Sequence, residues 1–531
     1  MTSPSRSRTT LAVLAVAACI ALASAAPAAQ TCETLSKLDL PATSITSAES
    51  VAAGSFTPPV GKALPNLPAF CRVAGVIKPS SDSSIQFEVW MPASHWNGKF
   101  QGAGNGGFAG AIGYDQLMNA VAHNYATAAT DTGHHAGGTD AAWALDHPEK
   151  IADFGYRAIH ETAVKAKAIL HAFYGEDPQR SYFSSCSNGG RQALMEAQRY
   201  PEDYDGIIAG APANYWTHLL SNAAWDNLAL LGGKDSYIPP KKLPAIQAAA
   251  LAACDALDGV KDGVIEDPSR CHFDPGVLLC QAAESDSCLT APQVAALKKL
   301  YAGGRNSRGQ IFPGYAPGGE AELGGWTAWI TGPAPERSLL YAFSTQFFKN
   351  MVFDNAAWDY HTFNADRDTK AAEDKQTRNM NATDPDLNRF RARGGKLILY
   401  HGWSDAAIAP ENTIDYYGSV AAKMGAQQTA GFARLFMVPG MQHCGGGSGT
   451  NSFGQYPGSS GDPDRDMEAA LERWVEKGVA PERIVAAKHK SDLDPASAIV
   501  RTRPLCAYPL VARYQGSGST DDDANFVCAK R

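Results

Sequence analysis

A serine on a short turn between a strand-like and a helix-like segment constrains this chain more than any other feature. Residues 180–186 favour a strand, and residues 192–200 are good helix formers with apolar side chains at helical spacing. Between them lies Ser187, followed by two adjacent glycines that permit close backbone approach. Such a strand–turn–helix segment is typical of a nucleophile elbow, in which the serine hydroxyl lies above the carboxyl end of a sheet. The usual pattern is G-x-S-x-G, and here Ser185 replaces the first glycine.

Strand-like and helix-like segments alternate on both sides of this turn. Further strands are expected at residues 85–92, 99–102, 125–130, 206–212, 396–401 and 433–438, and helices at 114–124, 154–174, 413–424 and 464–477. This alternation predicts an α/β sheet. Residues 30–80 hold a cysteine pair and few helical signals, so we expect them to form an N-terminal cap.

The alternation stops after residue 212 and resumes at residue 395. The residues between are richer in Trp, Pro and Gly, contain four cysteines and show only short helical patterns. We predict that residues 213–394 form a lid domain inserted into the sheet domain. Residues 30–212 and 395–531 would then be the first and second parts of the sheet domain.

The N-terminal residues 1–29 have the pattern of a signal peptide. Arg6 and Arg8 precede an apolar run at residues 11–23, and small residues follow. The run is too short for a membrane span, and no other run reaches about 18 apolar residues. We therefore expect a secreted or periplasmic protein. Lipidation at Cys19 is the alternative, although the apolar run continues past that cysteine.

Cysteine parity agrees with export. The chain has 11 cysteines, and removal of Cys19 with the signal leaves an even number. An even set in an exported chain suggests disulfides, although parity does not prove connectivity and a mixture of free and paired thiols is the alternative. Pairing nearest neighbours gives Cys32–Cys71, Cys254–Cys271, Cys280–Cys288 and Cys506–Cys528, and leaves Cys186 with Cys444.

The glycine-rich residues 102–107 allow two interpretations. They satisfy G-x-G-x-x-G after an expected strand, and a helix, a strand and Asp131 follow, as in a dinucleotide-binding unit. This predicts a nicotinamide-dependent oxidoreductase. However, an exported protein meets little of that cofactor, and the unit does not open its domain. We favour a loop that donates a backbone N–H to an oxyanion hole.

Two later strands end in residues that suit serine chemistry. A serine hydroxyl is a weak nucleophile and needs a histidine base that is held by a carboxylate. Asp405 follows the strand at 396–401, and His443 follows the strand at 433–438. Alone, Asp405 could be a helix cap and His443 a loop residue bonded to backbone. The order Ser187, Asp405, His443 at three strand ends predicts a catalytic triad on an α/β-hydrolase fold with a large inserted lid domain.

The residues beside the triad carry a family resemblance. Cys186 precedes Ser187 and Cys444 follows His443, so a bond between them would join the two loops. This arrangement resembles the CS-D-HC pattern of the tannase/feruloyl esterase family, which includes mono(2-hydroxyethyl) terephthalate hydrolase. Residues 104–110, 129–134 and 205–212 also resemble blocks of that family, and the resemblance covers nearly the whole mature chain.

The resemblance implies a mechanism and a metal site. Backbone N–H groups of Asn188 and of Gly107 or Gly106 would stabilise the oxyanion. Carboxylates interleaved with glycine in the lid suit a hard cation, although a solvated acidic turn is the alternative. By resemblance the cation is a structural calcium, remote from Ser187, with these ligands: the side chains of Asp255, Asp258 and Asp262 and the carbonyls of Val260 and Val264.

The expected activity is that of a serine carboxylesterase acting on hydroxycinnamate (feruloyl-type) aromatic esters. A tannase that hydrolyses gallate esters and a terephthalate monoester hydrolase are the alternatives. A further alternative is a calcium-dependent binding protein that has the hydrolase fold but no catalytic activity. Lid aromatics could line the acyl pocket, although most are expected in the lid core: Trp326, Trp329, Tyr341, Phe343, Phe347 and Phe348. The net charge of −8 gives no basic surface for nucleic acid.

Overall fold

The structure is a computed structural model that describes residues 1–4, 30–455, 461–494 and 496–530. The expected signal peptide at 1–29 and the alternative lipidation at Cys19 fall almost wholly outside the described residues. Within the described part of the chain, no helix is both long and apolar enough to cross a membrane.

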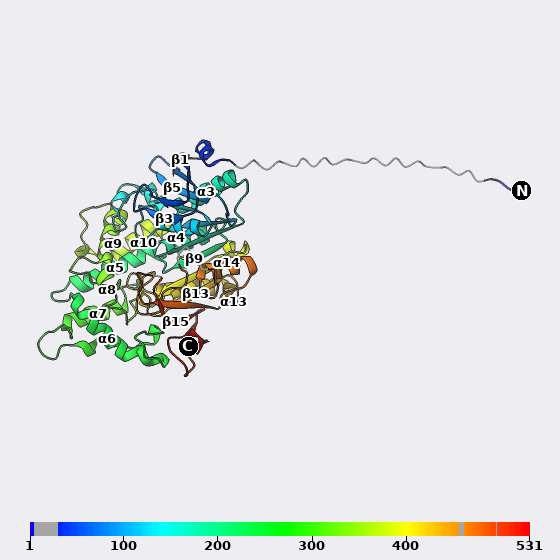
Figure 1. Cartoon of the computed structure of the whole chain (residues 1–531). Coiled ribbons are helices and arrows are strands. Elements are labelled where there is room, and N and C mark those ends of the chain that lie inside the picture. The colour runs from blue at the N-terminus through cyan, green and yellow to red at the C-terminus, as the bar shows by residue number, and fades with distance from the viewer. Residues whose placement is uncertain (5–29, 456–460, 495, 531) are drawn as a thin grey trace.

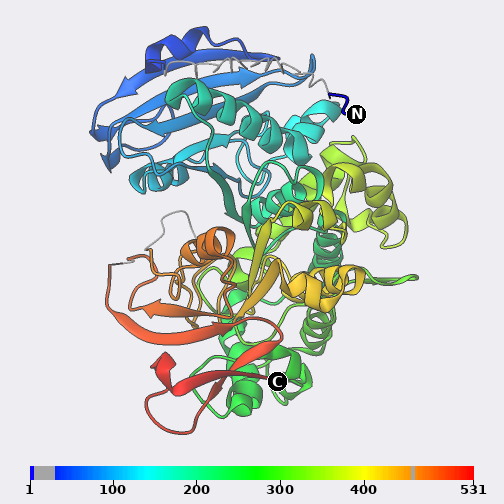
Figure 2. The same ribbon diagram turned by 90° about the vertical axis from the view of Figure 1, so that its right-hand side faces the viewer.

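A nine-stranded sheet forms the centre of the molecule (Figures 1 and 2). Its spatial order is β1-β4-β5-β7-β6-β8-β9-β12-β13. The pairs among β1, β4, β5 and β7 are antiparallel, and the pairs from β7 through β6 to β13 are parallel. The strands are β1 Thr43–Val51, β4 Phe70–Ile77, β5 Ile85–Pro92, β6 Lys99–Ala103, β7 Ala126–Thr130, β8 Arg180–Cys186, β9 Gly206–Gly210, β12 Lys396–Gly402 and β13 Ala433–Val438.

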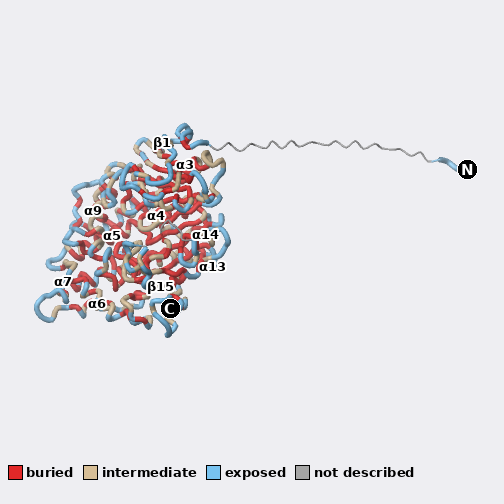
Figure 3. Tube along the Cα trace, viewed as in Figure 1, coloured by how far each residue is buried: buried red, intermediate tan, exposed pale blue. Residues whose placement is uncertain are grey.

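Helices cover both faces of this sheet, which confirms the predicted α/β class. Strand β12 shows why: Leu397 and Leu399 pack in one buried cluster, and Ile398 and Tyr400 pack in another on the opposite face. Figure 3 shows this buried centre in red beneath an exposed periphery. The first cluster includes side chains of α3 Ala158–Tyr174, α4 Asn188–Arg199 and α12 Glu411–Met424, and the second includes those of α1 Tyr114–Ala122 and α14 Met467–Lys477.

The prediction that residues 30–80 form a separate N-terminal cap is wrong. β1 and β4 belong to the central sheet, and only the short β2 Gly54–Phe56 and β3 Leu64–Leu67 form a separate pair. The alternation of burial along β1 is weak because this strand lies at the sheet edge, so its pattern gave little signal.

Residues between β9 and β12 lie outside the central sheet and contain seven α-helices and one short hairpin. The α-helices are α5 Trp216–Leu231, α6 Leu243–Cys254, α7 Ala291–Ala302, α8 Trp326–Trp329, α9 Leu339–Phe347, α10 Arg367–Met380 and α11 Asn388–Ala392, and the hairpin is β10 Arg305–Asn306 with β11 Gly309–Gln310. Part of this insertion packs on Phe108 and on residues 407–409, which lie in loops after β6 and β12. The insertion therefore covers the carboxyl edge of the sheet, where Ser187 emerges.

The C-terminal strands form two hairpins beside the insertion. They are β14 Arg483–His489 with β15 Ile499–Cys506, and β16 Leu510–Tyr514 with β17 Phe526–Lys530. Figures 1 and 2 both show these red strands next to the green helices of the insertion. The backbone N–H of Ala512 donates to Glu266, which joins the two segments. Two further short α-helices lie outside the insertion, α2 Pro148–Ala152 and α13 Ala426–Ala430.

Candidate active site

Ser187 lies on a tight turn between β8 and α4. Its backbone has φ 67° and ψ −127°, a left-handed region that is strained for a residue with a side chain. The turn is held because Ser187 N–H donates to the Gly210 carbonyl at 2.9 Å and the Ser187 carbonyl accepts from Arg191 N–H at 3.1 Å. A Cβ on Gly190 would lie 2.2 Å from that same Gly210 carbonyl oxygen, so the turn requires glycine there.

Ser185 fits where the usual motif has glycine. A Cβ on Gly189 would lie 1.9 Å from Ser185 Oγ, and one on Gly104 would lie 2.6 Å from it. The Ser185 hydroxyl therefore occupies space that two neighbouring glycines leave open. The departure from G-x-S-x-G does not disturb the turn.

The structure brings the three expected side chains together. His443 Nδ1 lies 2.8 Å from Asp405 Oδ2, and His443 Nε2 lies 2.8 Å from Ser187 Oγ. Because a carboxylate only accepts, Nδ1 carries the hydrogen and Nε2 is left to accept from the serine hydroxyl. This arrangement allows the imidazole to take the serine proton as the hydroxyl attacks.

Asp405 is held in its charged form. Burial alone would raise its pKa, but the electrostatic interaction with the His443 ring and the hydrogen bonds from His401 and His443 outweigh burial and lower the pKa. The backbone N–H groups of Ala407 and Ile408 also donate to Asp405 Oδ1, at 2.8 and 2.9 Å. The carboxylate is therefore fixed in place and ionised.

His401 is a buried residue beside Asp405 that sequence reasoning missed. Its Nε2 lies 3.0 Å from the Ile408 carbonyl and 3.2 Å from Asp405 Oδ2, and its Nδ1 lies 2.7 Å from Thr413 Oγ1. Since the carbonyl only accepts, Nε2 carries the hydrogen, and the Thr413 hydroxyl donates to Nδ1. The only local signal was its place on the strand that leads to Asp405.

The glycine loop after β6 reaches the same site. Gly106 and Gly107 line one cavity of about 330 Å³ together with Ser187 and His443. A Cβ on Gly107, at φ 55°, would lie 2.3 Å from the Gly138 carbonyl oxygen, so this position requires glycine. Within the described residues, the N–H groups of Gly106, Gly107 and Asn188 have no hydrogen-bond acceptor. The predicted oxyanion donors therefore have no competing acceptor among the described residues.

The dinucleotide alternative does not fit this loop. A helix N-terminus should follow the glycines directly, but α1 begins only at Tyr114. A Cβ on Gly102 would lie 2.2 Å from the Tyr204 hydroxyl. Protein packing therefore accounts for this glycine.

One of the six lid aromatics lines the cavity. The Trp329 ring packs edge-on against His443, with ring centroids 5.0 Å apart, and stacks on Phe343 at 6.1 Å. Trp326, Phe347 and Phe348 are buried inside the insertion. The sequence expectation that most of these residues are core agrees with this arrangement.

The cysteine next to Ser187 is bonded to the cysteine next to His443. Cys186 and Cys444 lie 258 residues apart in sequence, and their Cα atoms are 6.0 Å apart. This bond joins the loops that carry the hydroxyl and the imidazole. The other disulfides also follow the expected pairing: Cys32–Cys71, Cys254–Cys271, Cys280–Cys288 and Cys506–Cys528.

The acidic lid loop folds around its own carboxylates. Asp255 accepts from Asp262 N–H at 3.2 Å, Asp258 accepts from Val260 N–H at 2.9 Å, and Asp262 accepts from Val264 N–H at 3.2 Å. Burial, together with the nearby charge of Asp262, raises the pKa of Asp258. These oxygen donors match a hard cation, which would favour the charged form of Asp258.

Two arginines that sequence reasoning missed also reach this loop. Arg503 and Arg501 pair with Asp262 Oδ2 at 2.6 and 3.2 Å. The loop also touches the segment after His443, since Ser448 Oγ lies 3.5 Å from the Gly263 carbonyl oxygen. The acidic loop is thus in contact with the loop that carries His443.

The fold and this site define a carboxylic ester hydrolase. The chain belongs to the tannase and feruloyl esterase family, whose model matches residues 71–529. This confirms the resemblance inferred from the sequence.

Three relatives show how far the likeness extends. An uncharacterized esterase of Xanthomonas campestris pv. campestris is 48% identical over 523 residues, which cover 94% of this chain and 91% of the relative. A protein named probable feruloyl esterase B-2 of Aspergillus terreus is 34% identical and covers 86% of each chain. The crystal structure of feruloyl esterase B from Aspergillus oryzae has a TM-score of 0.86 and 32% identity, and covers 94% of this chain and 99% of that one.

Proposed function

We propose that this protein is an exported serine esterase that hydrolyses hydroxycinnamate-type aromatic esters through an acyl-enzyme. The observation that carries the proposal is the hydrogen-bonded chain from Ser187 through His443 to Asp405. The aromatic substrate class is supported by Trp329 in the cavity wall and by relatives that are named feruloyl esterases. Export is supported by five disulfides, which persist in oxidising compartments.

In the proposed mechanism each proton has a donor and an acceptor. Ser187 Oγ attacks the ester carbonyl carbon while His443 Nε2 takes its proton, and Asp405 stabilises the imidazolium that forms. The N–H groups of Asn188 and of Gly107 or Gly106 stabilise the oxyanion, and losing one such donor typically costs about 3 kcal/mol. His443 then protonates the departing alcohol. Water attacks the acyl-enzyme, gives a proton to His443, and the acid leaves as Ser187 regains its hydrogen.

A substrate panel tests the acyl specificity. We expect kcat/KM to be at least about tenfold higher for methyl ferulate than for methyl gallate, because gallate hydroxyls need partners that an indole wall does not supply. A terephthalate monoester should be a poor substrate, since the described residues that line the cavity include no arginine or lysine for its carboxylate. Methyl gallate as the best substrate would instead favour the tannase alternative.

A second experiment tests the role of His401. His401→Leu removes the donor to Asp405, and we expect kcat/KM to fall about 10- to 100-fold, because a hydrogen bond to a charged group is worth about 1.5–3 kcal/mol. His401→Gln keeps an N–H donor and should retain more activity. Thermal melts of both variants report folding. Wild-type kcat/KM in folded His401→Leu would show that this contact does not position Asp405.

We also propose that the lid loop binds a structural calcium through Asp255, Asp258 and Asp262, with Val260 and Val264 carbonyls completing the set. The cation would offset the carboxylate charge that Arg501 and Arg503 only partly balance. Because the loop contacts Ser448, the site would also stabilise the loop that carries His443.

Calcium removal is expected to lower thermal stability. Treatment with EGTA should reduce Tm by about 3–5 °C, because a ligand that binds only the folded state adds stability by mass action. Asp258→Asn should abolish this dependence on calcium. Asp286→Asn, which changes an exposed carboxylate elsewhere in the lid, is the matched control and should keep it. An equal Tm with and without calcium would contradict the site.

A further inference from the structure

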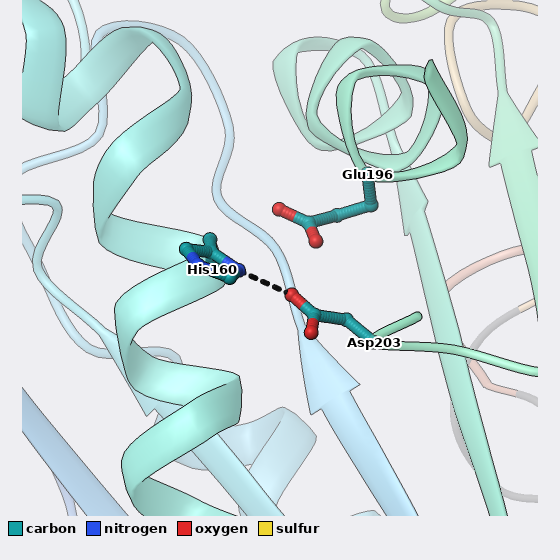
Figure 4. A group of neighbouring side chains, drawn as sticks. All are labelled: His160, Glu196 and Asp203. Carbon is teal, nitrogen blue, oxygen red and sulfur yellow. Dashed lines mark hydrogen bonds and ion pairs between the residues drawn. The ribbon is translucent and has the colours of Figure 1, made fainter. Parts of the chain in front are cut away.

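A second cluster of ionisable side chains lies between two helices of the sheet domain (Figure 4). His160 comes from α3, Glu196 from α4, and Asp203 from the turn after α4. One potential ligand atom of each residue lies within 4.8 Å of those of the other two. His160 Nδ1 is 2.6 Å from Asp203 Oδ2. None of the three belongs to the active site described above.

Neither carboxylate oxygen of Glu196 accepts a hydrogen bond from an N–H or hydroxyl group among the described residues. It is only 1% exposed, and in Figure 4 its carboxylate lies on the side of His160 and Asp203. Burial, and next the charge of Asp203 and a hydrogen bond with its carboxyl group, raise the pKa of Glu196 well above its ordinary value. A buried carboxylate without donors is costly, so it needs either a proton or a cation.

The groups around the cluster fix the His160 ring and supply one positive charge. The His160 ring is held flat against Tyr200, with ring centroids 3.7 Å apart, and its Nδ1 faces Asp203. Lys167 donates to the backbone carbonyl of Asp203 and supplies a nearby positive charge. With both carboxylates ionised, as metal binding requires, they face one ammonium group, which leaves negative charge for a cation to neutralise.

We propose that His160, Glu196 and Asp203 form a binding site for a divalent cation of the zinc class. An imidazole nitrogen suits zinc and related first-row metals, and zinc also accepts carboxylate oxygens, whereas calcium and magnesium prefer oxygen alone. The cation would join α3 to α4, the helix that begins directly after Ser187. Its role would therefore be to stabilise the position of α4, the helix that follows the serine turn.

Binding requires a small rearrangement and the release of a proton. Two ligands of a tetrahedral zinc ion lie roughly 3.3 Å apart, so His160 Nδ1 and Asp203 Oδ2 must separate by about 0.7 Å. Nδ1 must be free of hydrogen and Glu196 must be ionised, so the protons that the cluster carries leave as the metal enters.

The experiment uses untagged protein that has been stripped with a chelator and then returned to a buffer that contains excess calcium and no other divalent metal ion. Zinc is titrated by calorimetry in buffers of different ionisation enthalpy, and cobalt is titrated by visible absorption. We expect one zinc ion per chain with a Kd of about 1 μM or tighter, at least about one proton released, and cobalt bands typical of nitrogen–oxygen ligation. An all-oxygen lid loop would not produce those bands.

Variants assign the binding to this cluster. Glu196→Gln should weaken zinc binding at least about 100-fold, and Glu202→Gln should leave it unchanged, since Glu202 is an exposed carboxylate in the same turn. The wild-type titration decides the question even if Glu196→Gln misfolds. If wild-type protein takes up no zinc or cobalt, or if folded Glu196→Gln binds zinc as tightly as wild type, the proposal is overturned. Glu196 would then be neutralised by a proton.

Discussion

Ser187→Ala is expected to lower kcat/KM for p-nitrophenyl ester hydrolysis by roughly 10⁵-fold while leaving the melting curve almost unchanged. The loss is large because no other hydroxyl occupies the position 2.8 Å from His443 Nε2 within the described site. Folding should persist because alanine suffers no more backbone strain than serine at φ 67°. Steady-state kinetics and circular dichroism measure the two effects.

Ser185→Gly is the matched control. It restores the glycine of the usual motif and removes a hydroxyl that packs between Gly104 and Gly189. We expect its kcat/KM to stay within about tenfold of wild type, because the Ser187–His443 contact is untouched. Substantial activity in folded Ser187→Ala would place the nucleophile elsewhere.

Removing the bond between Cys186 and Cys444 should damage both stability and catalysis. The bond closes a 258-residue loop, and restriction of the unfolded chain contributes about 5 kcal/mol for a loop of this size. The bond also fixes the loops of Ser187 and His443, and a misplacement of about 1 Å can cost roughly 100-fold in rate. The double variant Cys186→Ser/Cys444→Ser should therefore show a markedly lower Tm and a kcat about 100-fold lower.

A second disulfide separates these two effects. Cys280–Cys288 spans only 8 residues in the insertion, so Cys280→Ser/Cys288→Ser should lose less stability and keep wild-type kcat. Chemical denaturation and steady-state kinetics at a temperature where each variant is folded measure both quantities. Wild-type kcat in the folded Cys186→Ser/Cys444→Ser protein would show that the bond stabilises the fold without setting the catalytic geometry.

Local patterns were enough to predict the parallel half of the sheet and the serine turn. Parallel strands such as β9 and β12 are buried on both faces, so they stand out as short apolar runs between turns. The pair Gly189–Gly190 marked the close approach of α4 to its neighbours. The order of Ser187, Asp405 and His443 then followed from where three strands end.

Contacts between residues far apart in the chain could not be predicted from the sequence patterns. In sequence, His401 looks like any buried strand residue. Only the bend of the chain after the strand places Asp405 in contact with it. Arg503 meets Asp262 across 241 residues, and no local spacing encodes that pair. Glu196 looks like a solvated helix residue, yet it is only 1% exposed because α4 is covered on nearly every side. Each of these depends on tertiary packing rather than on a neighbour in sequence.

Covalent labelling tests the central claim most directly. An aryl alkylphosphonate ester mimics the tetrahedral intermediate and reacts with an activated serine, so mass spectrometry of the labelled protein can identify the nucleophile. The account predicts a single adduct, mapped to Ser187, that forms far more slowly in His443→Ala. An adduct on another residue, or equal labelling of Ser187 in His443→Ala, would contradict it.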